Sequence, residues 1–600
     1  MLWAVFCLFG LLALALALCL LLQKPLADCL PLGAFGAILL LYLAGLAGRL
    51  QLGIAAVGLA ALALCVLAGR AAAQRPLVLG PQLAAGLRQA GLFMLPSALL
   101  LCLSWGRIST VWDDLSHWGR AVRDMMAWDK LACIPQATTT YKGYPPASSL
   151  FEYLFARYAG PAAESAAIFG LGVLLCACMM PCLRRCAGRG WWLGFFAWLP
   201  LFGFAAVFFE KAYRMLYVDL LLGLLFADLL FHALREQTPT PFDWGYILLE
   251  SAVLCLTKET GIALCGFAAA ILLANAWLCR PKRAGRAGRV QLLLGPAALL
   301  AGLLAKQSWT VYRNLFRTGD AWDTSAVTLP ALQRVLAGQL ADYQRQCIAT
   351  FRHYLFTSKR YILWIAGFLL LLAVWGWWAR RKKAAGAAAA GLLLSFAAFA
   401  LSLLVLYLFT FTPEEAAACA SMNRYLYNHL LGAWYLGMLL LLDHAFAAGV
   451  PPKARAACLG GLAAAFCGAA VLLGTPAYIG SLLPPFCFAE TRQANAARDI
   501  SVGLRACRDQ LGREDTVLIL AQDAQGQPLD AYSALLLSYE ASPAHAVICG
   551  EDLGPEQLTQ RLAGCGATCL YLYSLPPALQ AAGDETLRLG GFYRLNAAAP

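Results

Sequence analysis

Residues 3 to 22 form an unbroken apolar run that reads WAVFCLFGLLALALALCLLL. A helix of roughly 20 apolar residues is long enough to cross the hydrocarbon core of a bilayer, so this run predicts a transmembrane helix. No basic residue precedes the run, and no clear cleavage site follows it near Gln23. These two observations favour a retained anchor over a removed signal peptide.

The rest of the chain has the same character. Of its 600 residues, 61% are hydrophobic and only 13% are charged, and the mean hydropathy is +0.66. Apolar runs recur through residues 1–480, and about 14 of them are predicted to span, among them 216–234, 245–257 and 290–309. The sequence therefore predicts an all-α, multi-pass membrane domain over residues 1–480 of a protein of the cell membrane.

Basic residues between the spans predict how the chain is oriented, because loops rich in Lys and Arg stay in the cytoplasm. Counting outward from these loops places both termini and three loops, 106–160, 310–359 and 412–428, on the outer side. The net charge of +13 then reflects orientation, and it favours anionic lipids as neighbours. The sequence has no basic patch interleaved with aromatic residues, which is the pattern that would indicate nucleic-acid binding. The basic groups are Arg184, Arg185 and Arg189; Arg280, Lys282, Arg283, Arg286 and Arg289; Arg380, Arg381, Lys382 and Lys383; and Lys453 and Arg455.

Beyond residue 480 polar residues return, and residues 481–600 are predicted to form a small α/β domain outside the membrane. Gly554-Pro555 indicates a helix start before Glu556 to Ala563. The predicted strands are Thr516 to Ala521, Ala534 to Tyr539, Ala546 to Cys549 and Cys569 to Tyr573.

The 22 cysteines lie mostly within apolar spans, where a free cysteine behaves as a small hydrophobic residue. Cys133, Cys347, Cys419 and the five from Cys487 to Cys569 lie outside the spans, but one sequence gives no disulfide pairing. No CxxC pair has metal spacing, so neither a metal site nor another cofactor is predicted. A divalent cation is nevertheless compatible with the acids described next.

An acidic pair stands in the first outer loop, in the sequence Trp112-Asp113-Asp114-Leu115-Ser116-His117-Trp118-Gly119. Two neighbouring carboxylates repel each other, which raises one pKa and can yield a base for a hydroxyl proton. Capping of a helix start is the alternative role. A short interfacial helix over residues 113–127 would place His117 on the same face as Asp114.

Two further groups of polar residues lie on the same predicted side. The loop Thr138-Thr139-Thr140-Tyr141-Lys142-Gly143-Tyr144-Pro145-Pro146 offers hydroxyls, aromatic rings and Lys142 to a sugar or a phosphate, although ordinary loop composition explains it nearly as well. Arginine can hold phosphate oxygens in a bidentate manner, whereas anchoring at the membrane surface is the alternative for each cation. The second group comprises Glu210, Lys211 and Arg214, with Asn423, Arg424 and Tyr425.

The sequence Thr257-Lys258-Glu259-Thr260-Gly261 interrupts 35 mostly apolar residues, so two short helices are predicted to meet there. Ionisable residues at such a break indicate a functional site, and Lys258 could meet an anionic phosphate. Mutual pairing of Lys258 with Glu259 is the alternative.

Together, the acidic pair, the break at Leu256 to Gly261 and the Arg424-Tyr425 loop resemble the GT-C superfamily of membrane glycosyltransferases. Its members include protein O-mannosyltransferases and lipid A aminoarabinose transferases. The resemblance implies inverting transfer of a sugar from a polyprenyl-phosphate carrier, with Asp113 as base and Lys258 and Arg424 facing the carrier phosphate. The acidic pair follows the fourth predicted span rather than the first, and its second acid is Asp114 where relatives often have Glu, which leaves open which acid is the base.

The predicted function is thus glycosyl transfer in the cell envelope to a hydroxyl of a glycan, a lipid or a protein. A base for the acceptor and cations for the departing phosphate suit this reaction. An O-antigen-type polymerase or ligase and a secondary transporter are the alternatives. The chain has no phosphate-binding GxxxxGK[ST] loop, which argues against an ATP-driven pump.

Overall fold

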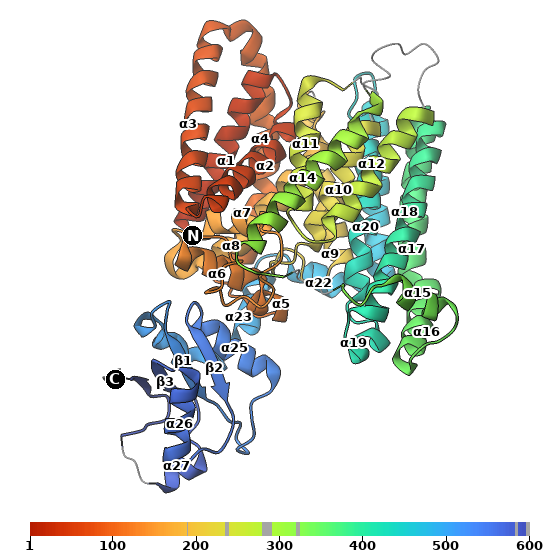
Figure 1. The fold of residues 1–600 in the computed structure, drawn as a ribbon. Helices are drawn as coiled ribbons and strands as arrows, with labels where there is room; N and C mark the ends of the chain where they lie inside the picture. The colour runs from red at the N-terminus through yellow and green to blue at the C-terminus, as the bar shows by residue number, and fades with distance from the viewer. Residues whose placement is uncertain (189, 235–238, 279–290, 320–323, 583–585, 596–600) are drawn as a thin grey trace.

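A computed structural model of the chain describes all residues except 189, 235–238, 279–290, 320–323, 583–585 and 596–600. Arg189 and the predicted cytoplasmic cations from Arg280 to Arg289 therefore lie outside the described residues. Long helices run side by side in a bundle, and a small sheet with its own helices lies beyond one end of that bundle (Figure 1).

Eleven of the described helices are long and apolar enough to cross a membrane. They confirm a multi-pass, mainly helical membrane protein. They are α1 (Leu2–Leu22), α2 (Leu26–Leu46), α3 (Leu50–Gln74), α4 (Pro76–Ser104), α8 (Ala163–Met179, with flanking turns), α9 (Gly194–Phe208, with the turn before it), α12 (Gly261–Leu278), α17 (Lys359–Trp378), α18 (Lys382–Phe409), α20 (Met422–Ala445) and α21 (Pro452–Leu472).

Three predicted spans, 216–234, 245–257 and 290–309, form helices that are not among these eleven. α10 (Asp219–Leu234) has 16 residues and α11 (Pro241–Cys255) has 15. At 1.5 Å per residue α11 is about 23 Å long, whereas α10 ends next to residues 235–238, which lie outside the described part of the chain. α14 (Leu294–Asn314) has 21 residues, but its second half is polar from Lys306 onward.

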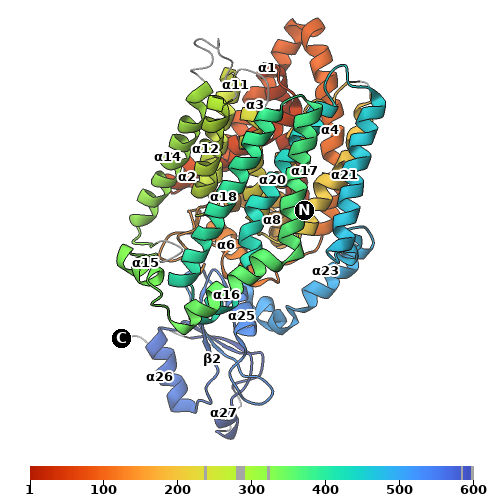
Figure 2. The ribbon, with the colours of Figure 1, turned by 90° about the vertical axis from the view of Figure 1, so that its right-hand side faces the viewer.

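The helices differ in how far they are enclosed. The span windows of α8 and α20 are completely buried, whereas only 11% of that of α3 is buried. α20 packs along α10 and also against α17 and α18. Figure 2 shows α12, α17, α18 and α20 running alongside one another. A polar side chain on α20 therefore lies in the middle of the bundle.

The short helices gather at the end of the bundle that faces the sheet (Figure 1). Residues from the three predicted outer loops thus share one end, as expected, while the side of the membrane on which that end lies stays a prediction. The short helices are α5 (Trp112–Ser116), α6 (Trp118–Trp128), α7 (Ala147–Ala156), α15 (Leu329–Leu336), α16 (Asp342–Thr357), α19 (Pro413–Ala418), α22 (Pro476–Ser481) and α23 (Phe486–Ala496).

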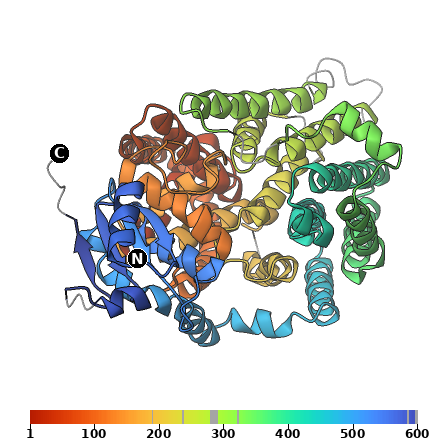
Figure 3. The same cartoon turned by 60° about the horizontal axis from the view of Figure 1, so that its bottom comes forward.

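The C-terminal region contains a four-stranded sheet in the order β2-β1-β3-β4. β1 pairs in parallel with β2 and β3, and β4 is antiparallel to β3. Figure 3 shows this region beneath the N-terminal half of the bundle, away from α17 and α18. The elements are β1 (Thr516–Leu520), α25 (Ala531–Ala541), β2 (His545–Cys549), α26 (Pro555–Cys565), β3 (Cys569–Leu572), α27 (Pro577–Ala581) and β4 (Phe592–Arg594), after α24 (Val502–Ala506).

The sheet confirms a small α/β region, with one correction. Residues 534–539, predicted as a strand, lie inside α25. The Asp530 side chain accepts hydrogen bonds from the backbone N–H groups of Tyr532 and Ser533, which caps the helix start. A short apolar run does not distinguish a buried strand from a helix. The cap at Asp530 favours the helix here. The predicted helix after Gly554-Pro555 is confirmed as α26.

Candidate functional site

The acidic pair lies on α5, which is one short turn of helix. Residues 113–127 do not form the single predicted helix, because α5 ends at Ser116, His117 has φ −143° and α6 begins at Trp118. Leu115 is fully buried and packs with Leu536 and Tyr539 of α25. The C-terminal region therefore packs against the face of α5 that carries Leu115.

The two acids have different surroundings. Asp114 is 1% exposed, and its Oδ1 accepts a hydrogen bond from the backbone N–H of Leu216 at 3.1 Å. Burial, with a smaller contribution from the charge of Asp113, raises the pKa of Asp114 well above its usual range. Asp113 has a 17% exposed side chain, and its Oδ2 lies 2.5 Å from Arg424 Nη1. Asp114 is therefore a weaker acid than an ordinary aspartate, whereas Asp113 is half of an ion pair.

Four charged residues from distant segments form one cluster, which we call the charge cluster: Asp113, Asp219, Lys258 and Arg424. Lys258 Nζ donates to Asp219 Oδ1 at 2.9 Å. Arg424 Nε lies 3.6 Å from Asp219 Oδ2 in addition to its contact with Asp113. Asn428, one turn along α20 from Arg424, donates to Asp219 Oδ1 at 3.2 Å. Two cations thus share two carboxylates at one end of the bundle.

The break before α12 positions Lys258, and it confirms the predicted meeting of two short helices. α11 ends at Cys255 and α12 begins at Gly261. A Cβ atom at residue 261 would collide with the carbonyl oxygen of Leu254, so the tight turn requires glycine. Lys258 is only 4% exposed. A lysine buried to this degree needs a carboxylate partner, which Asp219 supplies.

Glu259 faces away from its neighbour. It forms an ion pair with Lys306 of α14, and Arg313 lies 3.9 Å from its other oxygen. Mutual pairing of Lys258 with Glu259, the alternative drawn from the sequence, is therefore not the arrangement found.

A cavity of about 350 Å³ opens beside the charge cluster. Its polar end is formed by Lys258, Glu259, Thr260 and Tyr425, and Ser402 lies along it. Ala263 and Thr324 also line it, and most of the apolar wall comes from α18 and the residues after it: Phe399, Leu403, Leu406 and Phe411. A polar end with an apolar wall suits an amphiphile that carries an anionic head group on a hydrocarbon chain.

The aromatic residues of the first loop pack around His117. The ring of His117 lies 5.1 Å from that of Tyr141 and 5.3 Å from that of Tyr144, and Tyr144 stacks on Trp118 at 5.0 Å. Burial and the charges of Lys258 and Arg424 lower the pKa of His117 well below its usual value. His117 is therefore neutral at pH 7 and adds a polar, uncharged wall near the charge cluster.

Three predicted binding residues have other contacts. Lys142 Nζ donates to the carbonyl oxygen of Pro135 at 2.7 Å. Arg214 donates to the carbonyl oxygen of Ser481 at 2.6 Å and lies 3.6 Å from Glu490. Lys211 is exposed on the connection between α9 and α10. In the described residues, no contact joins any of the three to the charge cluster, and Arg214 instead secures the segment that leads to the C-terminal region.

Asp219 is the member of the cluster that sequence reasoning missed. It is 2% exposed and stands in the run 216–234, which was read as a plain membrane span. An acid inside an apolar run is itself an indication of function, so the signal was present. Asn428 gave no comparable signal, because its role follows only from its position one turn after Arg424.

In the described part of the chain, no group of three or more His, Cys, Asp or Glu residues is placed so as to hold a metal ion. The carboxylates of the charge cluster are bonded to cationic side chains.

Comparison with known proteins gives similarity in structure but not in sequence. No family model matches the chain, and no curated protein matches its sequence. A crystal structure of ArnT from Cupriavidus metallidurans in the apo state is similar over 84% of this chain and 96% of that chain, with 15% identity and a TM-score of 0.45. Similarity of this degree shows neither a family nor an activity. From its own helices, the chain is a multi-pass membrane protein with a small α/β region.

Proposed function

We propose that the protein is a glycosyltransferase that moves a sugar from a polyprenyl-phosphate carrier to a hydroxyl acceptor, with inversion at the anomeric carbon. The reaction takes place on the outer face of the membrane. One observation carries the proposal: Lys258 belongs both to the charge cluster that contains Asp113 and to the polar end of the cavity whose wall is formed by α18.

The donor fits the cavity by its chemistry. A polyprenyl phosphate has an anionic head and a long apolar chain, which match Lys258 at one end and Phe399, Leu403 and Leu406 along the wall. Lys258 and Arg424 are now balanced by Asp113 and Asp219. A bound phosphate would compete for these cations, and its negative charge increases as the sugar departs, which is when the cations stabilise it most.

The acceptor reacts on the Asp113 side of the cluster. Asp113 takes the proton of the acceptor hydroxyl, the hydroxyl oxygen forms a bond with the anomeric carbon, and the bond between that carbon and the phosphate oxygen breaks. The electron pair leaves with the lipid phosphate. Within the described residues, Asp113 Oδ1 accepts no hydrogen bond, which keeps one oxygen open to the acceptor. Asp114 is buried and accepts a hydrogen bond from the backbone of Leu216, so it positions the turn.

Donor-dependent release of polyprenyl phosphate tests this proposal. The purified full chain in lipid nanodiscs is given a panel of polyprenyl-phosphate sugars, and released polyprenyl phosphate is measured with and without soluble glycan, lipid or peptide acceptors. Release with at least one donor that is lost in Asp113→Asn and kept in Lys211→Gln supports transfer. A transporter would move a solute into proteoliposomes without consuming donor. Absence of release across the panel would overturn the proposal.

A further inference from the structure

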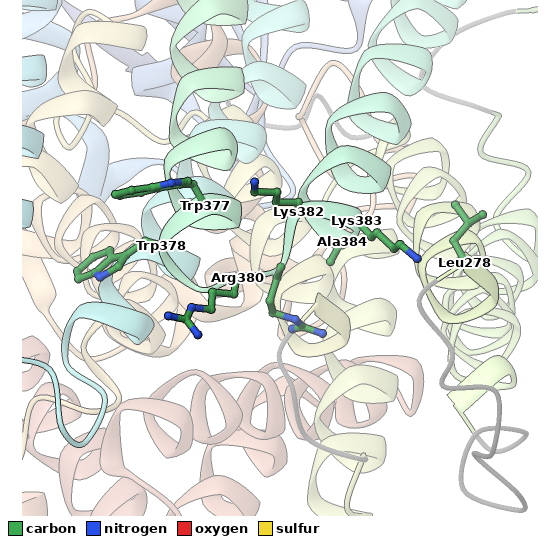
Figure 4. Close-up of a pocket in the computed structure, with 8 residues that line it drawn as sticks. Leu278, Trp377, Trp378, Arg380, Lys382, Lys383 and Ala384 are labelled. Carbon is green, nitrogen blue, oxygen red and sulfur yellow. The ribbon is translucent and has the colours of Figure 1, made fainter.

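The turn from α17 to α18 lies at the end of the bundle opposite to the sheet (Figure 1), and a second, larger cavity opens beside it. Its volume is about 840 Å³. Figure 4 shows Trp377 and Trp378 on one side and Lys383 extending toward Leu278 on the other. The lining is Leu278, Trp377, Trp378, Arg380, Arg381, Lys382, Lys383 and Ala384. None of the described lining residues is acidic, so the cavity is cationic. It is separated from the charge cluster by the length of the bundle (Figure 1).

The turn geometry brings these cations to the cavity. α17 ends at Trp378, Arg380 adopts a left-handed conformation with φ 56°, and the backbone N–H of Arg381 donates to the carbonyl of Gly376 at 2.8 Å. This closed turn lets α18 begin immediately at Lys382. Four consecutive basic residues are thus held on a short, hydrogen-bonded turn instead of a long loop.

The cations differ in what they already contact. Arg381 donates to the carbonyl oxygen of Leu234 and lies over the ring of Trp375, with 5.8 Å to the ring centre. Arg380, Lys382 and Lys383 are exposed, and in the described residues none of the three has an acidic partner. Three positive charges around one cavity therefore remain available to an anion.

The tryptophans add an apolar surface at the same level. Trp377 is 71% exposed, whereas the ring of Trp378 contacts the edge of His444 at 4.8 Å. Tryptophan and basic residues together are typical of the depth at which lipid head groups lie. An orientation signal needs only positive charge, so it does not account for a lined cavity with one exposed and one anchored indole.

We propose that this cavity binds a phosphate ester through Arg380, Lys382 and Lys383, with the indole rings against its apolar part. The shared chemistry is an anionic phosphate, which can come from a membrane lipid head group or from a free phosphate in solution. The binding site is independent of the proposed glycosyl transfer, because it shares no residue with the charge cluster or its cavity.

Binding can be measured without any catalytic assay. The full chain is placed in nanodiscs of phosphatidylcholine alone or with phosphatidic acid, and retained phosphatidic acid is counted by native mass spectrometry. A second arm adds inorganic phosphate to neutral nanodiscs and follows tryptophan fluorescence. The test variant is Lys382→Gln with Lys383→Gln. The control is Arg70→Gln with Arg75→Gln, which removes two exposed cations, one in the last turns of α3 and one between α3 and α4.

Two cations near a lipid surface are each worth about 1 kcal/mol, so the test variant should bind phosphatidic acid at least about tenfold more weakly than the control. That result supports a lipid source. A saturable fluorescence change with inorganic phosphate, lost only in the test variant, supports a soluble source. Equal binding of both ligands by test and control variants would overturn the proposal, and size-exclusion profiles check that both variants remain folded.

Discussion

Arg424 of α20 lies between Asp113 and Asp219, at 2.5 Å from an oxygen of the first and 3.6 Å from an oxygen of the second. The contact with Asp113 joins residues 311 positions apart in the sequence. An arginine in this position holds the proposed base and the proposed phosphate site in one geometry. Substitution of Asp113 or Asp219 should therefore disturb both the proposed base and the proposed phosphate site.

Neutralising the cations should weaken use of the donor. We expect Lys258→Gln and Arg424→Gln each to raise the KM for the polyprenyl-phosphate sugar more than tenfold, which is a loss of at least about 1.4 kcal/mol. Arg424→Lys keeps the charge and should recover part of that loss. Steady-state kinetics in detergent measure the effect, with exposed Lys211→Gln as the matched control. Donor kinetics equal to the wild type in both neutral variants would reduce Lys258 and Arg424 to structural partners of Asp219.

The two acids should respond differently to amidation. Asp113→Asn keeps the shape and removes the proton acceptor, so turnover should fall roughly 100-fold or more while the donor still binds. Asp114 is buried with a raised pKa and bonds to the backbone of Leu216, so Asp114→Asn should mainly perturb the turn. Its effect should therefore stay below about tenfold. Turnover and donor binding are measured on the same preparations. If Asp114→Asn alone is inactive, the roles of the two acids are reversed.

The orientation has a direct test. In a background where the exposed Cys467 is replaced by serine, an external, membrane-impermeant maleimide should label Gln136→Cys and Gln525→Cys in intact cells. Gly285→Cys should react only after the membrane is opened, because basic loops stay in the cytoplasm. Labelling of residue 285 from outside would place the charge cluster on the cytoplasmic face.

Asp124 predicts a pH dependence of stability. Its carboxylate accepts hydrogen bonds from the backbone N–H groups of Thr138 and Thr139, each at 2.9 Å, yet burial raises its pKa to about 6 from an ordinary value of 3.8. The native state then holds this proton more tightly than the unfolded chain does. The contribution of Asp124 to stability is therefore largest at low pH and is lost as the pH rises through about 4 to 6.

Thermal unfolding of the detergent-solubilised protein at pH 4 and pH 7 measures this effect. Between pH 4 and pH 7, the free energy of unfolding of the wild type should fall relative to that of Asp124→Asn, by up to about 3 kcal/mol. A difference that is the same at both values would show that Asp124 does not titrate in this window.

Local patterns in the sequence predicted much of the fold. Apolar runs of sufficient length indicated most membrane helices, and the polar interruption before Gly261 indicated the break between α11 and α12. The strand prediction at residues 534–539 failed because an apolar run alone does not distinguish a strand from a capped helix. The runs 216–234 and 245–257 form α10 and α11, whose ends differ from the predicted bounds because a sequence gives helix ends only approximately.

The site was predictable in part. Asp113, Lys258 and Arg424 each carried a local signal, and the structure brings them together with Asp219. Lys142 and Arg214 carried similar signals but contact Pro135 and Ser481 instead. A cation near a membrane surface looks the same in a sequence whether it faces a ligand or a carbonyl, and only the packing of distant segments separates the two cases.

Contacts between the segments on either side of α5 and the C-terminal region also determine when the site is completed during synthesis. Tyr532 donates to the carbonyl oxygen of Thr110 at 2.5 Å across 422 residues, and Arg123 donates to the carbonyl oxygen of Tyr539 across 416. Chains emerge from the ribosome starting at the N-terminus. The turn that carries Asp113 is therefore made early, but the segments on either side of it gain these contacts only after α25 has been synthesised and folded against them.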